Sequence, residues 1–88
     1  MILQVKVKVK IDTLKEFGEK LMSNKLDRSA IISETYCEKD EPLIGISYWK
    51  IDNLSEFETK FSLWKPYYEK IEIKEVVTAK EAMISLFN

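Results

Sequence analysis

The chain has 88 residues and a mass of 10.4 kDa, which is the size of one domain with one hydrophobic core. Hydrophobic residues make up 45% of it and charged residues 33%, a balance that excludes disordered and low-complexity proteins. Its 14 basic and 15 acidic side chains leave a net charge of −1, so no overall basic field attracts nucleic acid or an anionic membrane.

Residues 3–11 alternate between apolar and polar side chains. Neighbouring side chains of a strand point to opposite faces, so this pattern predicts a strand with one apolar face and one charged face. The apolar set is Leu3, Val5, Val7, Val9 and Ile11, and the polar set is Gln4, Lys6, Lys8 and Lys10.

The segment that begins at Thr13 has the pattern of an amphipathic helix. Thr13 and Glu16 have the spacing of a capping box, in which each side chain accepts a hydrogen bond from a backbone N–H at the helix start. Apolar residues follow at helical spacing, at Leu14, Phe17 and Leu21. We therefore expect a first helix here, packed on the apolar face of the strand.

The next segment predicts a β-hairpin. Residues 30–39 are rich in Ile, Thr, Ser and Tyr, which favour strands, and residues 43–51 form a second strand-like run. Asp40, Glu41 and Pro42 lie between the two runs and are typical of a turn. Because the connection is short, the two strands are expected to pair in antiparallel fashion.

A second helix, a fourth strand and a short third helix follow. Asn53 with Glu56 repeats the helix-start signal, and Pro66 ends the pattern. The apolar stripe of this helix is Leu54, Phe57, Phe61 and Trp64. Residues 69–77 form the fourth predicted strand, and Thr78 opens the last helix.

The predicted order is therefore β-α-β-β-α-β with a C-terminal helix, within a single domain that spans residues 1–88. Two right-handed crossovers of this kind give the α+β, ferredoxin-like fold. It has an antiparallel four-stranded sheet with both long helices on one face. The first strand should be central, between the third and the fourth.

The third strand decides what the open face of this sheet carries. We expect Ile44, Ile46 and Tyr48 to join the valines beneath the helices, because they are the more apolar set. The open face would then hold Lys8, Tyr36, Ser47 and Trp49. Aromatic rings on an open sheet indicate a covered surface, so we expect a homodimer through this face and a lumen between the two sheets.

Residues 46–82 resemble the dimeric α/β-barrel superfamily, and most nearly its family of uncharacterised proteins called domain of unknown function 3303. The resemblance lies in Trp64 at the end of a helix, the acidic and apolar strand over residues 69–77, and Thr78-Ala-Lys-Glu-Ala82. It implies the ferredoxin-like fold and a homodimer. Some cofactor-free oxygenases and isomerases of that superfamily use the barrel lumen, although the family itself has no established activity.

Residue types limit the chemistry. Histidine is absent, which excludes Ser–His–Asp and Cys–His catalysis and histidine-ligated metals. We assign no catalytic residue, no metal site and no cofactor. Cys37 is the single cysteine and cannot form an internal disulfide, and no apolar run is long enough for a signal peptide or a membrane span. These features favour a cytoplasmic protein, without nucleic-acid or membrane partners.

Three hypotheses of function remain open from the sequence. The first is a small cytoplasmic homodimer that binds a small apolar or aromatic molecule between its sheet faces. Its expected ligand-binding residues are Lys8, Tyr36, Ser47 and Trp49. The second is a cofactor-independent oxygenase or isomerase acting on a small aromatic substrate. The third is a pure dimerisation module whose lumen is filled by side chains.

Overall fold

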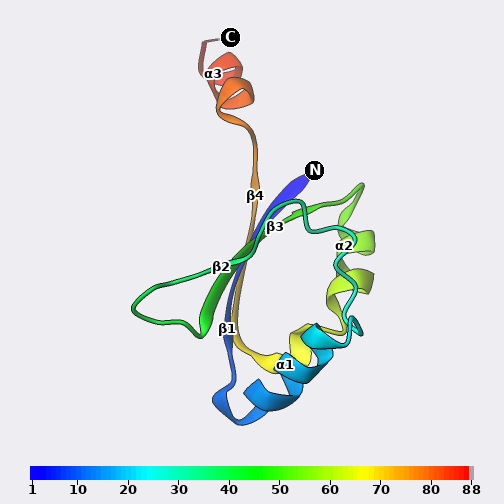
Figure 1. Ribbon diagram of the computed structural model, residues 1–88. Coiled ribbons are helices and arrows are strands. Elements are labelled where there is room, and N and C mark those ends of the chain that lie inside the picture. The colour runs from blue at the N-terminus through cyan, green and yellow to red at the C-terminus, as the bar shows by residue number, and fades with distance from the viewer. Residues whose placement is uncertain (88) are drawn as a thin grey trace.

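The computed structural model describes residues 1–87, and its elements follow the predicted order (Figure 1). The strands are β1 (Ile2–Val9), β2 (Tyr36–Cys37), β3 (Ile44–Lys50) and β4 (Tyr68–Val76). The helices are α1 (Leu14–Met22), α2 (Leu54–Phe61) and α3 (Ala79–Phe87), with 3-10 turns η1 (Ile11–Thr13) and η2 (Lys65–Tyr67). None of the helices within residues 1–87 has the length and apolar character needed to cross a membrane.

The four strands form one antiparallel sheet in the order β2-β3-β1-β4. β1 is central, between β3 and β4, as predicted. Helices α1 and α2 lie on the same side of the sheet (Figure 1), which leaves the other face open. This is the predicted ferredoxin-like α+β fold, and the structure confirms it.

The alternation along β1 has the predicted orientation. Leu3, Val5, Val7 and Val9 are buried in the core together with aromatic side chains of both helices. The lysines between them are half-buried on the open face. Ile11 is the exception, because β1 ends at Val9 and Ile11 lies in the η1 turn, where it is 76% exposed.

β3 shows the main departure from the prediction. The register pairs Leu3 with Trp49, Val5 with Ser47 and Val7 with Gly45. Directly paired residues of antiparallel strands share a face, so Ser47 and Trp49 lie beneath the helices. Ile44, Ile46 and Tyr48 therefore line the open face. The prediction for β3 is therefore wrong, because it assigned the two sets of alternating side chains to the opposite faces. Side chains of a strand alternate with a period of two, so an error of one residue exchanges both sets completely.

The indole of Trp49 accounts for this register. Its ring is 1% exposed and packs edge-on against Phe57, Phe61 and Trp64, with centroid distances of 5.3, 5.6 and 5.7 Å. Its Nε1 donates a hydrogen bond to the Ser47 hydroxyl oxygen at 2.9 Å, so burial leaves no unpaired donor. The free energy gained by burying the large indole, whose N–H keeps a hydrogen bond, is greater than the free energy lost by leaving the smaller isoleucine side chains half-exposed.

β2 is much shorter than the predicted strand over residues 30–39. Only Tyr36 and Cys37 pair with β3 as a strand, and Ile31 adds a single bridge to Trp49. Residues 32–35 between them are exposed and form a loop beside the outer edge of β3, where the Ile32 N–H donates to the Tyr48 carbonyl at 3.0 Å. Two of the β-branched residues that favoured a strand here, Ile31 and Thr35, line the cavity described below.

The two predicted helix starts behave differently. Asn53 caps α2, because its side chain accepts the Glu56 N–H at 2.8 Å, and Glu56 in turn accepts the Asp52 N–H at 2.8 Å. Thr13 does not cap α1. Its hydroxyl donates to the Lys10 carbonyl at 3.1 Å, since the η1 turn precedes the helix and changes the backbone there.

The Glu56 cap predicts a dependence of stability on pH. The Asp52 N–H, and then Lys60, lower the pKa of Glu56 from the ordinary value. A carboxylate with a lowered pKa in the folded state stabilises above its unfolded pKa, and this contribution is lost as pH falls through its folded value. The free energy of unfolding in urea should differ most between the wild type and Glu56→Gln near pH 7. This difference should shrink as the pH falls below about 4.3, the ordinary pKa of a glutamate. A difference independent of pH between 7 and 3 would contradict this.

Candidate ligand-binding site

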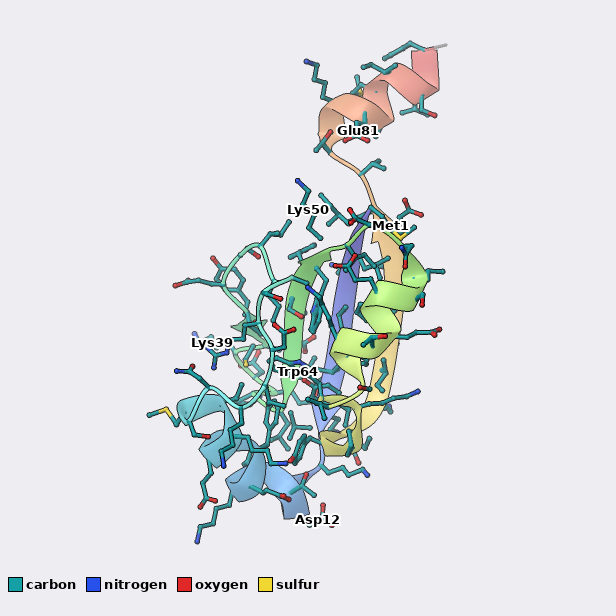
Figure 2. The ribbon with its side chains drawn as sticks, turned by 90° about the vertical axis from the view of Figure 1, so that its right-hand side faces the viewer. Met1, Asp12, Lys39, Lys50, Trp64 and Glu81 are labelled. Atoms are coloured by element: carbon teal, nitrogen blue, oxygen red, sulfur yellow. The ribbon has the colours of Figure 1, made fainter. Side chains whose placement is uncertain are left out.

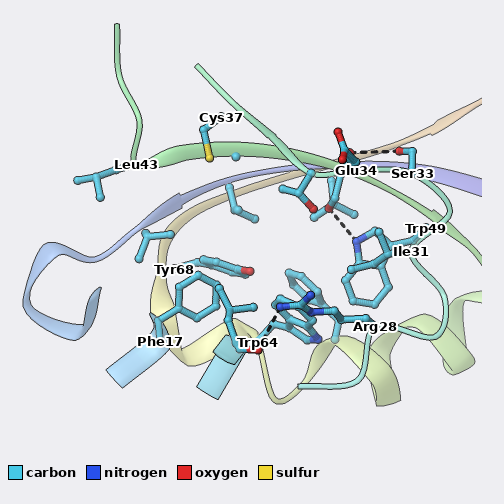
Figure 3. Close-up of a pocket in the computed structure, with 18 of the residues that line it drawn as sticks. Phe17, Arg28, Ile31, Ser33, Glu34, Cys37, Leu43, Trp49, Trp64 and Tyr68 are labelled. Atoms are coloured by element: carbon cyan, nitrogen blue, oxygen red, sulfur yellow. Dashed lines mark hydrogen bonds between the residues drawn. The ribbon is translucent and has the colours of Figure 1, made fainter. Parts of the chain in front are cut away.

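A cavity of about 660 Å³ lies between the helix-covered face of the sheet and the segment that links α1 to β2. β1 and β3 form one wall through Val5, Val7 and Ser47. Residues from α1, α2 and the start of β4 form another, and the loop over residues 28–35 borders the opening (Figure 3). The cavity therefore exists because β2 is short and its approach is a loop.

Aromatic rings dominate the inner end of this cavity. Trp49, Trp64, Phe17, Phe61 and Tyr68 all line it. Their neighbouring centroids lie 5.6 to 6.2 Å apart, in edge-on arrangements for Trp49 with Phe61 and for Phe17 with Trp64. The indole of Trp64 is fixed by a hydrogen bond from its Nε1 to the Asp27 carbonyl at 3.2 Å. Such a wall suits a flat apolar or aromatic molecule.

Two hydroxyl groups provide polarity at the aromatic end. Ser47 is 8% exposed, and its oxygen accepts the Trp49 N–H. Within residues 1–87 the Ser47 hydroxyl donates to no protein group, so its proton can reach a bound molecule. Burial raises the pKa of Tyr68 far above its ordinary value, so this phenol stays protonated. In Figure 3 its hydroxyl points into the space toward the two indoles.

Charged groups lie nearer the opening. Arg28 lines the cavity, and its Nη2 donates to the Leu21 carbonyl at 3.2 Å, which ties the loop to the end of α1. Glu34 also lines the cavity, beside Ser33 (Figure 3). The thiol of Cys37 borders the same space and is free and exposed. The opening therefore carries one cation, one anion and one thiol.

The structure divides the four predicted ligand-binding residues between two faces. Ser47 and Trp49 lie together in the cavity. Lys8 is on the open face, where it pairs with Glu41 at 3.1 Å and Glu69 at 3.6 Å. These carboxylates, Glu41 first, raise the pKa of Lys8.

Tyr36 also faces away from the cavity. It lies opposite Ile46 in the register and is 62% exposed. A single site that holds all four residues between two sheet faces is therefore not what the structure builds. From the sequence, Tyr68 after Pro66 had two interpretations, as a residue of a pocket mouth or as a contact between the helix end and the fourth strand, and the structure places it in the cavity. Glu34 was expected on the open face with the second strand, and Arg28 was not singled out, because both lie in a loop without a pattern.

No family model matches the chain, and no curated protein matches it. The resemblance to the domain of unknown function 3303 family therefore stays a prediction.

Solved structures are similar to this chain in fold. A protein classed with the antibiotic biosynthesis monooxygenases, from Bacteroides thetaiotaomicron, has a TM-score of 0.57 and 12% identity, over 90% of this chain and 89% of that one. A second antibiotic biosynthesis monooxygenase has a TM-score of 0.50 and 6% identity, over 89% of this chain and 100% of that one. A conserved protein from Methanosarcina mazei has 24% identity and a TM-score of 0.47, over 84% and 89% of the two chains. At such identities the likeness to the two monooxygenases shows the fold alone.

Proposed function

We propose that this protein binds a small apolar or aromatic molecule in the cavity between its sheet and its helices. The observation that carries the proposal is the aromatic wall of a space of about 660 Å³, with only two hydroxyl groups at its inner end. This volume lies within the range of about 300–1,000 Å³ that is typical of small-molecule sites. The site differs from the one expected between two sheet faces, because Ser47 and Trp49 point to the helix side.

The polar groups narrow the class of ligand. The Ser47 oxygen accepts the Trp49 N–H through one lone pair and keeps its O–H proton, and Tyr68 is a neutral phenol, so both can donate a hydrogen bond inward. A ligand that presents an acceptor oxygen, as a ketone or a quinone does, satisfies these donors. A pure hydrocarbon leaves them unpaired in a buried place, which costs binding free energy.

We further propose a cytoplasmic homodimer that forms through the open face of the sheet. This face carries the half-buried side chains Ile44, Ile46 and Tyr48, and no helix covers it within residues 1–87. Ion pairs lie on the same face, where Lys6 of β1 reaches across β3 to Glu38 at 3.4 Å and Lys8 lies 3.1 Å from Glu41. Apolar side chains interspersed with paired charges are compatible with the mixed composition of a protein–protein interface.

A second candidate is a cofactor-free monooxygenase of small aromatic substrates. The likeness in fold to two antibiotic biosynthesis monooxygenases favours it. The reaction balances without an outside reductant when one O₂ converts a substrate CH₂ group to a C=O group and releases one water, because the substrate supplies the electrons. Such a substrate would occupy the same cavity, with the oxygen of its product facing Ser47 and Tyr68.

Calorimetric titration with 1-tetralone, a bicyclic aromatic ketone, tests the binding proposal. We expect saturable binding, and binding of the matched hydrocarbon tetralin weaker by about 10-fold, which corresponds to one hydrogen bond of about 1.4 kcal/mol. The reaction of Cys37 with a thiol reagent should slow when 1-tetralone is bound, because the thiol borders the cavity.

Absence of heat together with an unchanged thiol reaction would overturn the proposed site. Consumption of dissolved O₂ with an aromatic CH₂ compound such as tetralin would favour the second candidate over binding alone.

A further inference from the structure

Helix α3 is a nine-residue helix that buries none of its side chains. Its apolar residues are Ala79, Ala82, Met83, Ile84, Leu86 and Phe87, which leaves Lys80, Glu81 and Ser85 as its polar ones. Leu86 is 77% exposed and Phe87 is 80% exposed. A helix that is apolar around most of its surface is normally buried, and one this short is marginal without packing.

The helix is held away from its own domain. β4 is paired up to Val76, and residues 77–78 carry α3 beyond the end of the sheet, clear of α1, α2 and the open face (Figures 1 and 2). The described chain measures 49 Å along its longest axis and has a radius of gyration of 14.4 Å, against about 12 Å for a compact domain of this length. The apolar surface of α3 is therefore not covered by the domain to which the helix is attached.

The same molecule has an unfilled apolar groove of matching length. A space of about 380 Å³ lies between α2 and β4, lined by Leu54, Phe57, Phe61, Ile71 and Ile73. Leu54 is 55% exposed and Ile73 is 42% exposed. The α2 side of this groove is about 12 Å long and α3 about 13.5 Å, at 1.5 Å per residue.

Charges at the groove complement those of the helix. Glu58 and Lys65 line the groove, and neither forms an ion pair within residues 1–87. The charged side chains of α3 are Lys80 and Glu81, one of each sign and adjacent in its first turn. Lys80 lies beside the apolar stripe of α3 and can pair with Glu58 when the helix docks. Glu81, in contrast, lies on the far side of the helix and accepts a hydrogen bond from the Thr78 hydroxyl at 3.2 Å.

We propose that α3 of one copy docks in the α2–β4 groove of a second copy. Each chain then contributes one helix and one groove, so the exchange is reciprocal and closes around a two-fold axis. The stripe Ala79, Ala82, Met83 and Leu86 faces the groove, because these residues share one side of the helix. This inference rests on the proposed homodimer and assigns it a second contact, in addition to the open sheet face.

Size-exclusion chromatography with light scattering tests the exchange in full-length variants. The wild type at 10 µM should have twice the mass of 10.4 kDa. Met83→Glu and Ile73→Glu should each weaken the dimer on the order of 10- to 100-fold or more, because each removes a buried apolar contact twice per dimer. Ser85→Glu, on the polar side of α3, is the control and should leave the mass unchanged.

A charge exchange makes the test specific to this groove. Lys80→Glu should weaken the dimer, and Glu58→Lys in the same chain should restore it, because the pair is reversed rather than removed. Circular dichroism verifies that each variant is folded, and Leu86→Glu on the exposed helix replaces any variant that is not.

The outcomes separate the exchange from the dimer itself. A monomeric wild type would overturn both proposals. A dimer that is insensitive to Met83→Glu and Leu86→Glu would overturn the helix exchange and leave the sheet-face dimer standing. Weakening by the α3 variants alone, without an effect of Ile73→Glu and without charge rescue, would overturn the groove as the docking site.

Discussion

Replacing Trp49 by alanine is expected to remove a large part of the stability of the fold. The side chain is 1% exposed and contacts three aromatic rings from α2 and the turn that follows it. Truncation of a buried tryptophan typically costs about 3–5 kcal/mol, whereas a domain of this length has a total of about 4–13 kcal/mol. Urea unfolding followed by circular dichroism should show a midpoint shifted far toward zero, or a chain unfolded without urea.

Met22→Ala is the control for this prediction. It also truncates a large apolar side chain, but Met22 is 87% exposed at the end of α1 and lies away from the open face of the sheet. Its cost should stay within about 0.5 kcal/mol, as for most surface substitutions. Equal effects of Trp49→Ala and Met22→Ala would show that Trp49 is not beneath the helices, and the register of β3 would be wrong.

Filling the cavity from Gly45 is expected to prevent ligand binding without unfolding the protein. Gly45 lies on the cavity wall opposite Val7. A Cβ atom placed on it meets the Thr35 Cγ2 at 3.7 Å and the Tyr36 carbonyl oxygen at 4.0 Å, which are ordinary van der Waals distances. Gly45→Leu should therefore extend its outer carbons into the empty space. We expect its affinity for 1-tetralone to fall on the order of 10- to 100-fold.

Gly45→Ala is the matched control. One methyl group changes the backbone freedom in the same way but occupies little of the cavity, so its affinity should stay within a factor of about 4, corresponding to one methylene of burial. Melting temperatures of both variants should stay at or above the wild-type value. Wild-type affinity in Gly45→Leu, or complete loss in Gly45→Ala, would place the bound ketone somewhere else.

The sequence was sufficient for the fold because its signals are periodic. The alternation from Leu3 to Val9, the Asn53 cap and the aromatic stripe of α2 each belong to one element, and the order of those elements leaves few topologies. These local patterns gave the sheet order, the central position of β1 and the two helices on one side.

The site could not be obtained in the same way. Along β3, both faces carry apolar residues, so hydrophobic character alone does not decide between Ile46 and Trp49. The choice depends on a hydrogen bond between Ser47 and Trp49 and on rings from α2 that are distant in the sequence. Arg28 and Glu34 reach the cavity from a loop, where no period exists to predict direction.

The edges of the sheet bear on how this chain avoids polymerising. β2 has two residues, which is too short to recruit a further strand, whereas β4 exposes the backbone of nine residues along its outer side. Its charged side chains are Glu69, Lys70, Glu72, Lys74 and Glu75. Charged residues on an outer strand oppose cross-β growth. At the long exposed edge, protection against fibril formation therefore comes from the acidic and basic side chains that alternate along β4, and not from the interior of the domain.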